Sequence, residues 1–418
     1  MVRQRKEAST SHPEPAAQPS GPRPLSHRGM PALWVTEAQS TIGDQLARIA
    51  VMVLVYQQTS SAVWVAATLA LTYLPDLAGS LGLSWLADRY SRRGIMVIGS
   101  LVQASCFAAM AVPGQPPWGV AVLVALAAIA LAPYRAASMA QLPDLVPASD
   151  LKAVQDLMTW TRTVVQIGGF AIGGGVVVLV GTSAALLINA ATFVIAAAII
   201  RGGVPDTRSP QREPTEKQHG IIRPALAVLR SDRRLWSILM LLSLAGVTIV
   251  PDAVSAPLVV ELDAPTWTLG WILAAHPVGT AIGIPLRRRF FSDDRAVDRL
   301  VWISLAPLVV FVLLAAVPSV WVAVALLVVS GVGMAYHPAL SVEYLQHAPI
   351  EYRGTLMGIG RAVLRVSQGI GAALGGLVSQ AVGSSLGSVA LIALLGVMVA
   401  ARGLAVRRAA AAESGNLP

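Results

Sequence analysis

Two glycine-rich segments, GGFAIGGG at residues 168–175 and GIGAALGG at residues 369–376, each lie inside a long apolar stretch of the chain. A shift of 202 residues brings the regions around them into register. The shift pairs Gly169, Gly173 and Gly174 with Gly371, Gly375 and Gly376, and it pairs Tyr134, Pro147 and Gln166 with Tyr336, Pro349 and Gln368. Small residues recur in any packed membrane helix, but matched glutamine and proline positions favour a duplication. We therefore expect two similar halves in which these six glycines pack helices closely.

The composition indicates that lipid is the solvent for much of the protein. Of the 418 residues, 55% are hydrophobic and only 13% are charged, and the mean hydropathy is +0.65. A soluble domain carries roughly 25% charged residues, so this chain has too few charges to cover a surface exposed to water. The single cysteine, Cys106, excludes a disulfide within the chain, and no His/Cys cluster has zinc spacing. We expect no metal site and no cofactor.

Apolar stretches long enough to cross a bilayer recur along the chain, since a span needs about 20 residues. They predict an all-α membrane protein of twelve transmembrane helices in two pseudo-symmetric six-helix bundles. The predicted helices are 33–57, 62–87, 94–112, 117–141, 153–180, 183–201, 234–260, 267–287, 298–317, 320–343, 354–381 and 386–405. The corresponding domains are a disordered tail over 1–30, a bundle over 31–201, a linker over 202–232, a bundle over 233–405 and a second tail over 406–418.

The placement of charge predicts the topology. The chain has 31 Lys and Arg residues against 22 Asp and Glu residues. The charges lie in short clusters between long apolar runs, a placement that indicates membrane topology rather than nucleic-acid binding. With the N-terminus labelled cytoplasmic, every predicted outer loop lacks Lys and Arg, while the predicted inner segments are rich in both. This asymmetry places both termini in the cytoplasm. Abundant Ala, Val and Arg suggest a bacterium of high GC content, so the expected location is its plasma (inner) membrane.

The segment LADRYSRR at residues 86–93 resembles the loop signature GxLaDrxGrr of the major facilitator superfamily. Six of its residues match and two serines replace the glycines of the pattern; the matches are Leu86, Ala87, Asp88, Arg89, Arg92 and Arg93, and the replacements are Ser84 and Ser91. An ordinary positive-inside loop would explain the arginines but not Asp88. The segments IGDQLARIAVMVLVYQQTSSA (42–62) and YRAASMAQLPDLVPASDL (134–151) look like the branch that holds enterobactin exporters and macrolide-efflux proteins.

This resemblance implies a monomeric secondary transporter that exports a small hydrophobic or amphiphilic compound, such as a drug or secondary metabolite, by alternating access and proton antiport. It also implies that Asp88 helps to latch the outward-facing state. Asp144 would partner the nearby arginines, or it would be a solvated turn residue. The antiporter pattern GxxxGPxxGG is matched only in part, because Phe170 stands where proline is expected and Val165 where the first glycine is expected.

Ionisable and amide side chains at membrane depth are the candidate coupling and cargo-binding residues, because an uncompensated charge there costs at least about 2.5–3.5 kcal/mol. They are Asp44, Arg48, Asp76, Arg135, Arg162, Gln166, Asp252, His276, His337, Arg365 and Gln368. The two histidines either gain and lose a proton during transport or serve only to pack the helices together. Arg162 and Arg365, at nearly equivalent repeat positions, suit an anionic cargo or neutralise the carboxylates. Asp44 and Arg48 are spaced i, i+4, so they share a helix face and can instead simply pair.

Asp76 follows Pro75 in the middle of a span, and its own helix offers no basic residue one turn away. A low dielectric favours the neutral acid, which lets a carboxylate bind and release a proton near neutral pH. The alternative for Asp76 is an ion pair with Arg135 or Arg162 of another helix.

Two other functions fit parts of the sequence. A siderophore exporter or lipid translocator of the same fold would use the buried arginines for charged cargo. A membrane-embedded enzyme or receptor would need a soluble domain or an intramembrane nucleophile–base set, and neither is visible. Parallel repeats place the site at their interface near the bilayer midplane, where we expect a small-molecule substrate and protons to bind.

Overall fold

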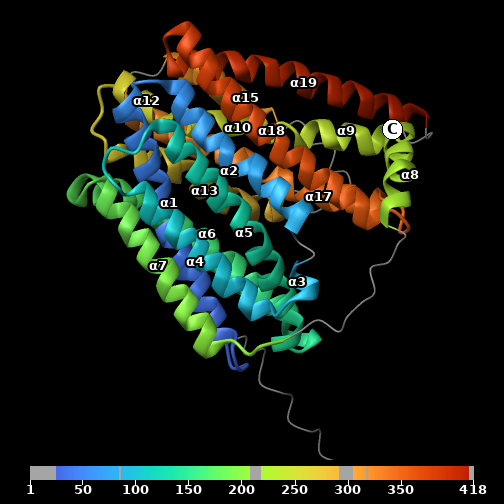
Figure 1. Ribbon diagram of the computed structural model, residues 1–418. Helices are drawn as coiled ribbons and strands as arrows, with labels where there is room; N and C mark the ends of the chain where they lie inside the picture. The colour runs from blue at the N-terminus through green and yellow to red at the C-terminus, as the bar shows by residue number, and fades with distance from the viewer. Residues whose placement is uncertain (1–24, 84–85, 208–217, 291–304, 317–318, 414–418) are drawn as a thin grey trace, which may run out of the picture.

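The computed structural model describes residues 25–83, 86–207, 218–290, 305–316 and 319–413, and every regular element in these ranges is a helix. The N-terminal half forms the blue-to-green part of Figure 1. Its helices are α1 (Met30–Thr59), α2 (Ala62–Leu83), α3 (Leu86–Arg89), α4 (Arg92–Met110), α5 (Pro117–Leu145), α6 (Ala148–Val180) and α7 (Thr182–Gly203).

The C-terminal half forms the yellow-to-red part of the molecule (Figure 1). It contains α8 (Gln218–Ser231), α9 (Arg233–Leu242), α10 (Ala245–Thr248), α11 (Val250–Ala253), α12 (Ser255–Glu261), α13 (Thr268–Phe290), α15 (Ala306–Leu313), the 3₁₀ turn η1 (Leu314–Ala316), α16 (Val320–Gly333), α17 (Tyr336–His347), α18 (Arg353–Val382) and α19 (Ser385–Glu413). The predicted all-α membrane fold is confirmed.

Ten helical stretches among the described residues are long and apolar enough to cross a membrane, against the twelve predicted. The helix α1 has the necessary length, but Glu37, Asp44 and Arg48 make it more polar than those ten. The predicted span 298–317 lies partly outside the described residues, and its described part, Ala306–Ala316, is short. The polarity of α1 is a local cause of the first difference, while the second concerns a span that the structure describes only in part; the chain remains a multi-pass membrane protein.

Several helix boundaries differ from the sequence-based expectation. The predicted helix 234–260 is divided into α9, α10, α11 and α12. Proline lacks the N–H of a helical hydrogen bond, and Pro251 and Pro257 both lie in this segment. The predicted helix 62–87 is described as far as Leu83; residues 84 and 85 lie outside the described residues, and α3 begins at Leu86. The linker contains α8, and α19 continues to Glu413, well past the expected end at residue 405.

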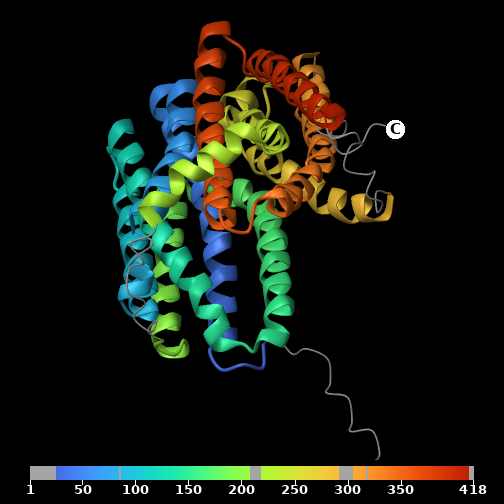
Figure 2. The same ribbon diagram turned by 90° about the vertical axis from the view of Figure 1, so that its right-hand side faces the viewer.

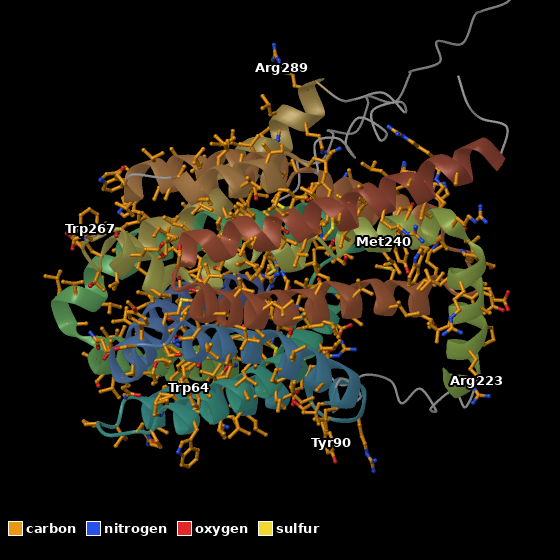
Figure 3. All side chains as sticks on the ribbon, turned by 90° about the horizontal axis from the view of Figure 1, so that it is seen from above. Trp64, Tyr90, Arg223, Met240, Trp267 and Arg289 are labelled. Atoms are coloured by element: carbon orange, nitrogen blue, oxygen red, sulfur yellow. The ribbon has the colours of Figure 1, made fainter. Side chains whose placement is uncertain are left out.

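The two halves lie side by side (Figure 2) and touch mainly through two helix pairs, α2 with α18 and α6 with α13. In the view of Figure 3, Trp267 and Arg223 lie at opposite ends of the molecule. We call the end that carries Arg223, Arg201 and Arg402 the basic end. The other end holds the short turns after α1, α6 and α18.

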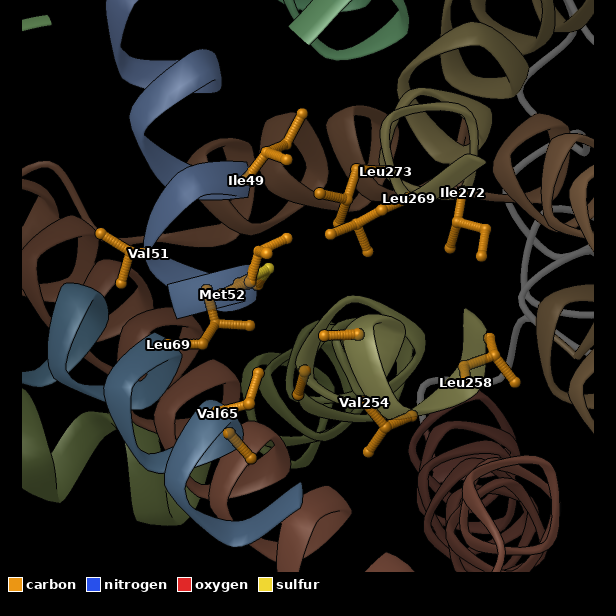
Figure 4. Packing of buried hydrophobic residues seen from close by; sticks show 14 of the residues in the cluster. Ile49, Val51, Met52, Val65, Leu69, Val254, Leu258, Leu269, Ile272 and Leu273 are labelled. Carbon is orange, nitrogen blue, oxygen red and sulfur yellow. The ribbon is translucent and has the colours of Figure 1, made fainter. Parts of the chain in front are cut away.

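A single apolar core joins the halves at the end opposite the basic end. Figure 4 shows Ile49, Met52, Val65 and Leu69 of the first half facing residues of α12 and α13. Two further cores are each confined to one half: one surrounds Met96 and Ile200, and the other surrounds Leu340 and Leu404. The halves are therefore packed together at the end away from the basic end, which we call the sealed end, and have separate cores at the basic end.

The six glycines of the repeated segments all lie where a helix approaches another closely. A Cβ on Gly371 would collide with the backbone of Gly246 in α10, and a Cβ on Gly174 would collide with the carbonyl of Trp267. In the remaining four cases, a Cβ would press on a side chain of α1, on Val250 or on the start of α2; these glycines are Gly169, Gly173, Gly375 and Gly376. At Gly174 and Gly371, where the added atom would meet backbone, only a residue without a side chain permits such an approach.

We predict that Gly371→Ala destabilises the protein by on the order of 1–3 kcal/mol, because the added methyl group must push α10 and α18 apart. The matched control is Gly358→Ala in the same helix, where nothing lies within 4 Å of the new Cβ. Alanine favours a helix over glycine, so the control is expected to be neutral or slightly stabilising. Thermal unfolding of the purified protein in detergent measures both. Equal midpoints for the two variants would contradict the prediction.

Candidate functional site

Two ion pairs connect the halves part-way along the helices. Arg48 of α1 places Nη2 3.2 Å from Oδ2 of Asp252 in α11. Arg365 of α18 places Nε 3.3 Å from Oδ2 of Asp76 in α2. The carboxylates are largely buried, with side-chain exposures of 14% for Asp252 and 12% for Asp76. Each half therefore supplies one acid and one base to the interface.

Asp76 has a second partner in its own half. Nη1 of Arg135 in α5 lies 3.3 Å from Oδ1 of Asp76, so one carboxylate lies between two guanidinium groups. The Arg135 side chain is 51% exposed, which makes it the member of the site most open to a ligand. Arg365 also donates to Oε1 of Gln368, over 3.5 Å.

Tyr73 lies between the two ion pairs. Its hydroxyl accepts a hydrogen bond from Nη2 of Arg48 over 3.4 Å, and Cζ of Arg365 lies 5.6 Å from the centre of its ring. The result is a continuous row of contacts that we call the polar chain, which runs through Asp252, Arg48, Tyr73, Arg365, Asp76 and Arg135. Phe170 supports it from α6, with its ring centre 5.6 Å from Cζ of Arg48.

Local sequence explains how the helices present these groups. Tyr73 and Asp76 are spaced i, i+3, as are Arg365 and Gln368, so each pair shares one helix face. Asp252 follows Pro251 in the broken part of the second half, where the short helix α11 turns it toward α1. Arg48 therefore pairs with Asp252 of the other half. The alternative interpretation of the i, i+4 spacing required an ion pair between Arg48 and Asp44 instead.

The remaining charged candidates of the first half lie beside the polar chain. Asp44 is half-buried on α1, one turn before Arg48. Arg162 donates from Nε to Oε1 of Glu37 over 2.6 Å. Glu37 was missed from the sequence because it lies near the start of the first helix, where a charge is expected to reach water.

Three further candidates also lie outside the polar chain. His276 of α13 lies 3.2 Å from Oγ of Ser330 and packs edge-on against Phe311, inside the second half. His337 packs against the ring of Tyr336. Gln166 is half-buried on α6. These contacts match the packing interpretation of the histidines, while any role in binding stays a prediction.

The predicted gating loop forms a separate cluster at the basic end of the first half. Arg92 forms an ion pair with Asp144 and donates to the carbonyl of Ala140 over 2.7 Å. Arg93 lies 3.5 Å from Asp206, which Ser91 also contacts. Arg89 is exposed at the end of α3, and the side chain of Asp88 lies outside the described residues. Asp144 is therefore an arginine partner and not only a solvated turn residue.

The second half has a comparable cluster that the sequence analysis missed. Glu343 of α17, almost fully buried, lies 3.2 Å from Arg234 and 2.9 Å from Arg407. These contacts join α9, α17 and α19. The repeat shift of 202 carries Gln141 onto Glu343, and Gln141 is likewise buried, with hydrogen bonds to Pro205 and Thr207. The equivalence of Gln141 and Glu343 in the repeat was the feature of the sequence that could have identified this second cluster.

Comparison with known proteins gives a consistent fold. The family model described as Major Facilitator Superfamily matches residues 33–263. A search of curated proteins found no match to the chain.

Solved transporter structures share the fold at low sequence identity. A variant of the nucleoside transporter NupG has 15% identity and a TM-score of 0.73, covering 90% of this chain and 99% of that one. A POT family transporter in complex with 5-aminolevulinic acid has 12% identity and a TM-score of 0.71, covering 92% and 97%. A bacterial homologue of the human lysosomal transporter Spinster, in an inward-facing and unoccupied conformation, has 14% identity and a TM-score of 0.64, covering 91% and 92%.

We predict that Arg48→Asp destabilises the protein by on the order of 3 kcal/mol, because it leaves Asp252 facing a second carboxylate in a largely buried site. Exchanging both charges, with Arg48→Asp and Asp252→Arg in one protein, is expected to restore part of the loss. Arg402→Asp, at an exposed position on α19, is the control for a change of net charge. Thermal unfolding in detergent reports all three. If the double variant is no more stable than Arg48→Asp, the ion pair does not hold the halves as described.

Proposed function

Because the chain belongs to the Major Facilitator Superfamily, we propose that it is a secondary transporter that exports a small amphiphilic compound by alternating access, in exchange for protons. One observation carries the proposal: a chain of paired charges crosses the interface between the halves, with a shared apolar core on one side of it and separate cores on the other. Such an interface can part at one end while it stays joined at the other.

The packing supports a conformation that is open toward the basic end. The positive-inside rule makes the basic end cytoplasmic, so this state faces inward, in the plasma membrane of a bacterium. Opening the sealed end requires the apolar core around Met52 and Val65 to divide and the Arg48–Asp252 ion pair to break. Alternating access is the exchange between these two arrangements.

The charges of the interface are balanced within the described helices. In and beside the interface, four carboxylates accompany four guanidinium groups. Asp76 and Asp252 pair with Arg48, Arg135 and Arg365, Glu37 pairs with Arg162 inside the first half, and Asp44 lies one turn from Arg48 on α1. Each proton that binds, or each charged group of a cargo, therefore leaves one net charge in a low-dielectric site. A ligand shifts a conformational equilibrium by its differential interaction with the two states, and an added charge provides that difference.

Asp76 is the favoured coupling residue because two guanidinium groups depend on it. When Asp76 binds a proton, Arg135 and Arg365 lose their shared anion and face each other with like charge. The repulsion favours separation of α5 and α18 or the entry of an anionic group. Deprotonation restores both ion pairs and with them the state described here.

Exposed guanidinium groups indicate the chemistry of the cargo. The side chains of Arg135, Arg162 and Arg365 are 51%, 43% and 33% exposed, and the ring of Tyr73 lies against Arg365. This combination suits an amphiphile that carries an acceptor or anionic group. The same arginines favour the second candidate, a siderophore exporter or lipid translocator.

The direction of transport rests on the likeness of residues 42–62 and 134–151 to the efflux branch. The solved neighbours are named for nucleoside and peptide transport and for Spinster. At 12–15% identity their likeness supports the fold and leaves the cargo open. We infer a monomer that needs no cofactor.

We predict that proteoliposomes with an acidic lumen accumulate one of three probes, ethidium, erythromycin or a catecholate siderophore, as protons leave. An uncoupler should abolish accumulation. Asp76→Asn should lower the driven flux by about tenfold or more, since proton transfer by a positioned group is typically worth a factor of about 100 to 10,000. Arg402→Gln, outside the site, should transport normally. Flux that survives the uncoupler would remove proton coupling, and the probe that accumulates identifies the cargo class.

A further inference from the structure

We propose that Tyr73 is the positioning residue that couples the two ion pairs between the halves, so that loss of charge at Asp76 loosens the contact between Arg48 and Asp252. The inference rests on the proposed transport function, and it names how one site within the interface regulates another. Tyr73 acts through the arginines on either side of it and needs no contact with cargo.

Tyr73 contacts both arginines through chemically different parts of one rigid side chain. Its hydroxyl accepts from Arg48 over 3.4 Å, and its ring faces Cζ of Arg365 at 5.6 Å from the ring centre. A guanidinium group over an aromatic face is attracted by the ring quadrupole. The side chain is only 8% exposed, so water does not readily replace either contact. A movement of Arg365 therefore acts on the same ring that steadies Arg48.

The two ion pairs lie at different depths in the interface. Arg48 lies eleven residues before the end of α1 at Thr59, and Arg365 lies seventeen residues before the end of α18 at Val382. At 1.5 Å per residue these positions are about 17 Å and about 26 Å from the sealed end. Asp76, fourteen residues into α2, is about 21 Å from it. Opening the sealed end must therefore part Arg48 from Asp252 before it disturbs Asp76.

Tyr73 supplies the connection that this order of events requires. While Asp76 is ionised, it holds Arg365 over the Tyr73 ring. With the ring held in this way, the hydroxyl steadies the Arg48 guanidinium, whose Nη2 also meets Asp252. When Asp76 is neutral, Arg365 loses its anion and leaves the ring free to turn. Arg48 then keeps Asp252 as a partner but loses the support that fixed its orientation.

Two charged groups contact Asp76 directly, Arg135 of α5 and Arg365 of α18. Arg48 of α1 and Asp252 of α11 form the neighbouring ion pair, which Tyr73 contacts through Arg48. Arg365 alone among them combines an ion pair with Asp76 and a contact with the Tyr73 ring. Removing only the Tyr73 hydroxyl deletes its contact with Arg48 and leaves both ion pairs of Asp76 in place, so that one change isolates the coupling.

The other helix pair that joins the halves is built differently. At the contact of α6 with α13, Arg162 pairs with Glu37 of its own half, and the close approach is made by backbone at Gly174 and Gly270. Among the described residues, the ion pairs between the halves therefore involve Arg48 of α1 and Arg365 of α18, and Tyr73 contacts both of these arginines. Tyr73 is placed to make the two ion pairs act as one unit.

The test measures opening of the sealed end directly. Cys106 is the single cysteine, so Cys106→Ala with Val254→Cys leaves one thiol, at a fully buried position in the shared core. Its rate of reaction with a maleimide in detergent reports how often the sealed end opens. We expect Asp76→Asn to raise this rate about tenfold when Tyr73 is present and less than about twofold together with Tyr73→Phe, a coupling typical of residues in one network. A similar rise in both proteins, or no rise in either, would overturn the proposal.

Tyr336→Phe is the matched control. The hydroxyl of Tyr336 makes a hydrogen bond of the same length, 3.4 Å, as the donor to the carbonyl of Leu241 inside the second half. Its loss should leave the response to Asp76→Asn intact. Should Tyr73→Phe fail to fold, Arg365→Lys provides a second route, because it keeps a cation for Asp76 but weakens contact with the ring; it is expected to reduce the response, and an unchanged response would again overturn the proposal.

Transport gives an independent readout that a purely structural role would not change. In proteoliposomes, Tyr73→Phe is expected to keep downhill flux of the accumulated probe and to lose its dependence on the pH gradient. A pH dependence equal to that of the unmodified protein would contradict the proposal. The labelling assay needs no cargo, so the two proposals can fail separately. If Asp76 is coupled to the sealed end but no probe is transported, the result contradicts the transport function and supports the coupling.

Discussion

Charges that lie in a low-dielectric interface must be neutralised by one another, and the rest of this structure depends on that requirement. Arg48 meets Asp252, and Asp76 meets both Arg135 and Arg365. An uncompensated charge at membrane depth would cost several kcal/mol. Each of these charged groups is therefore paired with an opposite charge on a neighbouring helix, in either half. Because two of these contacts cross between the halves, electrostatic pairing within the membrane is also what joins the halves there.

The apolar packing determines what this polar interface can do. On one side of it, α1, α2, α12 and α13 share a single core, and glycines bring α10 against α18 and α6 against α13 without side chains between them. On the other side each half has its own core. The interface is therefore asymmetric along the membrane normal although the halves are alike. This asymmetry supports a carrier that opens at one end at a time.

The halves are also unlike in how they use equivalent positions. Arg365 bonds across the interface to Asp76, while Arg162, its near-equivalent, bonds to Glu37 of its own half. Glu343 binds two arginines where its counterpart Gln141 binds backbone and a threonine. A duplicated framework with differently charged positions thus places an ion pair between the halves at α2 and α18, while Arg162 of α6 pairs within its own half. The coupling we infer for Tyr73 uses the ion pair between α2 and α18.

Residue types and their order along the chain were enough to predict the membrane environment, the two similar halves and most helix positions. They also identified Asp76, Arg135, Arg365 and Asp252 as groups that need partners. Hydropathy and charge placement are properties of short segments, so they can be read along one chain. Which acid meets which base was decided only in the tertiary structure. The ion pair of Arg48 with Asp252 joins residues 204 positions apart, and the breaks between α9 and α12 follow from prolines together with contacts to α18. Tyr73 had no signal of its own, because a tyrosine in an apolar helix is unremarkable until two arginines from different halves are seen to converge on it.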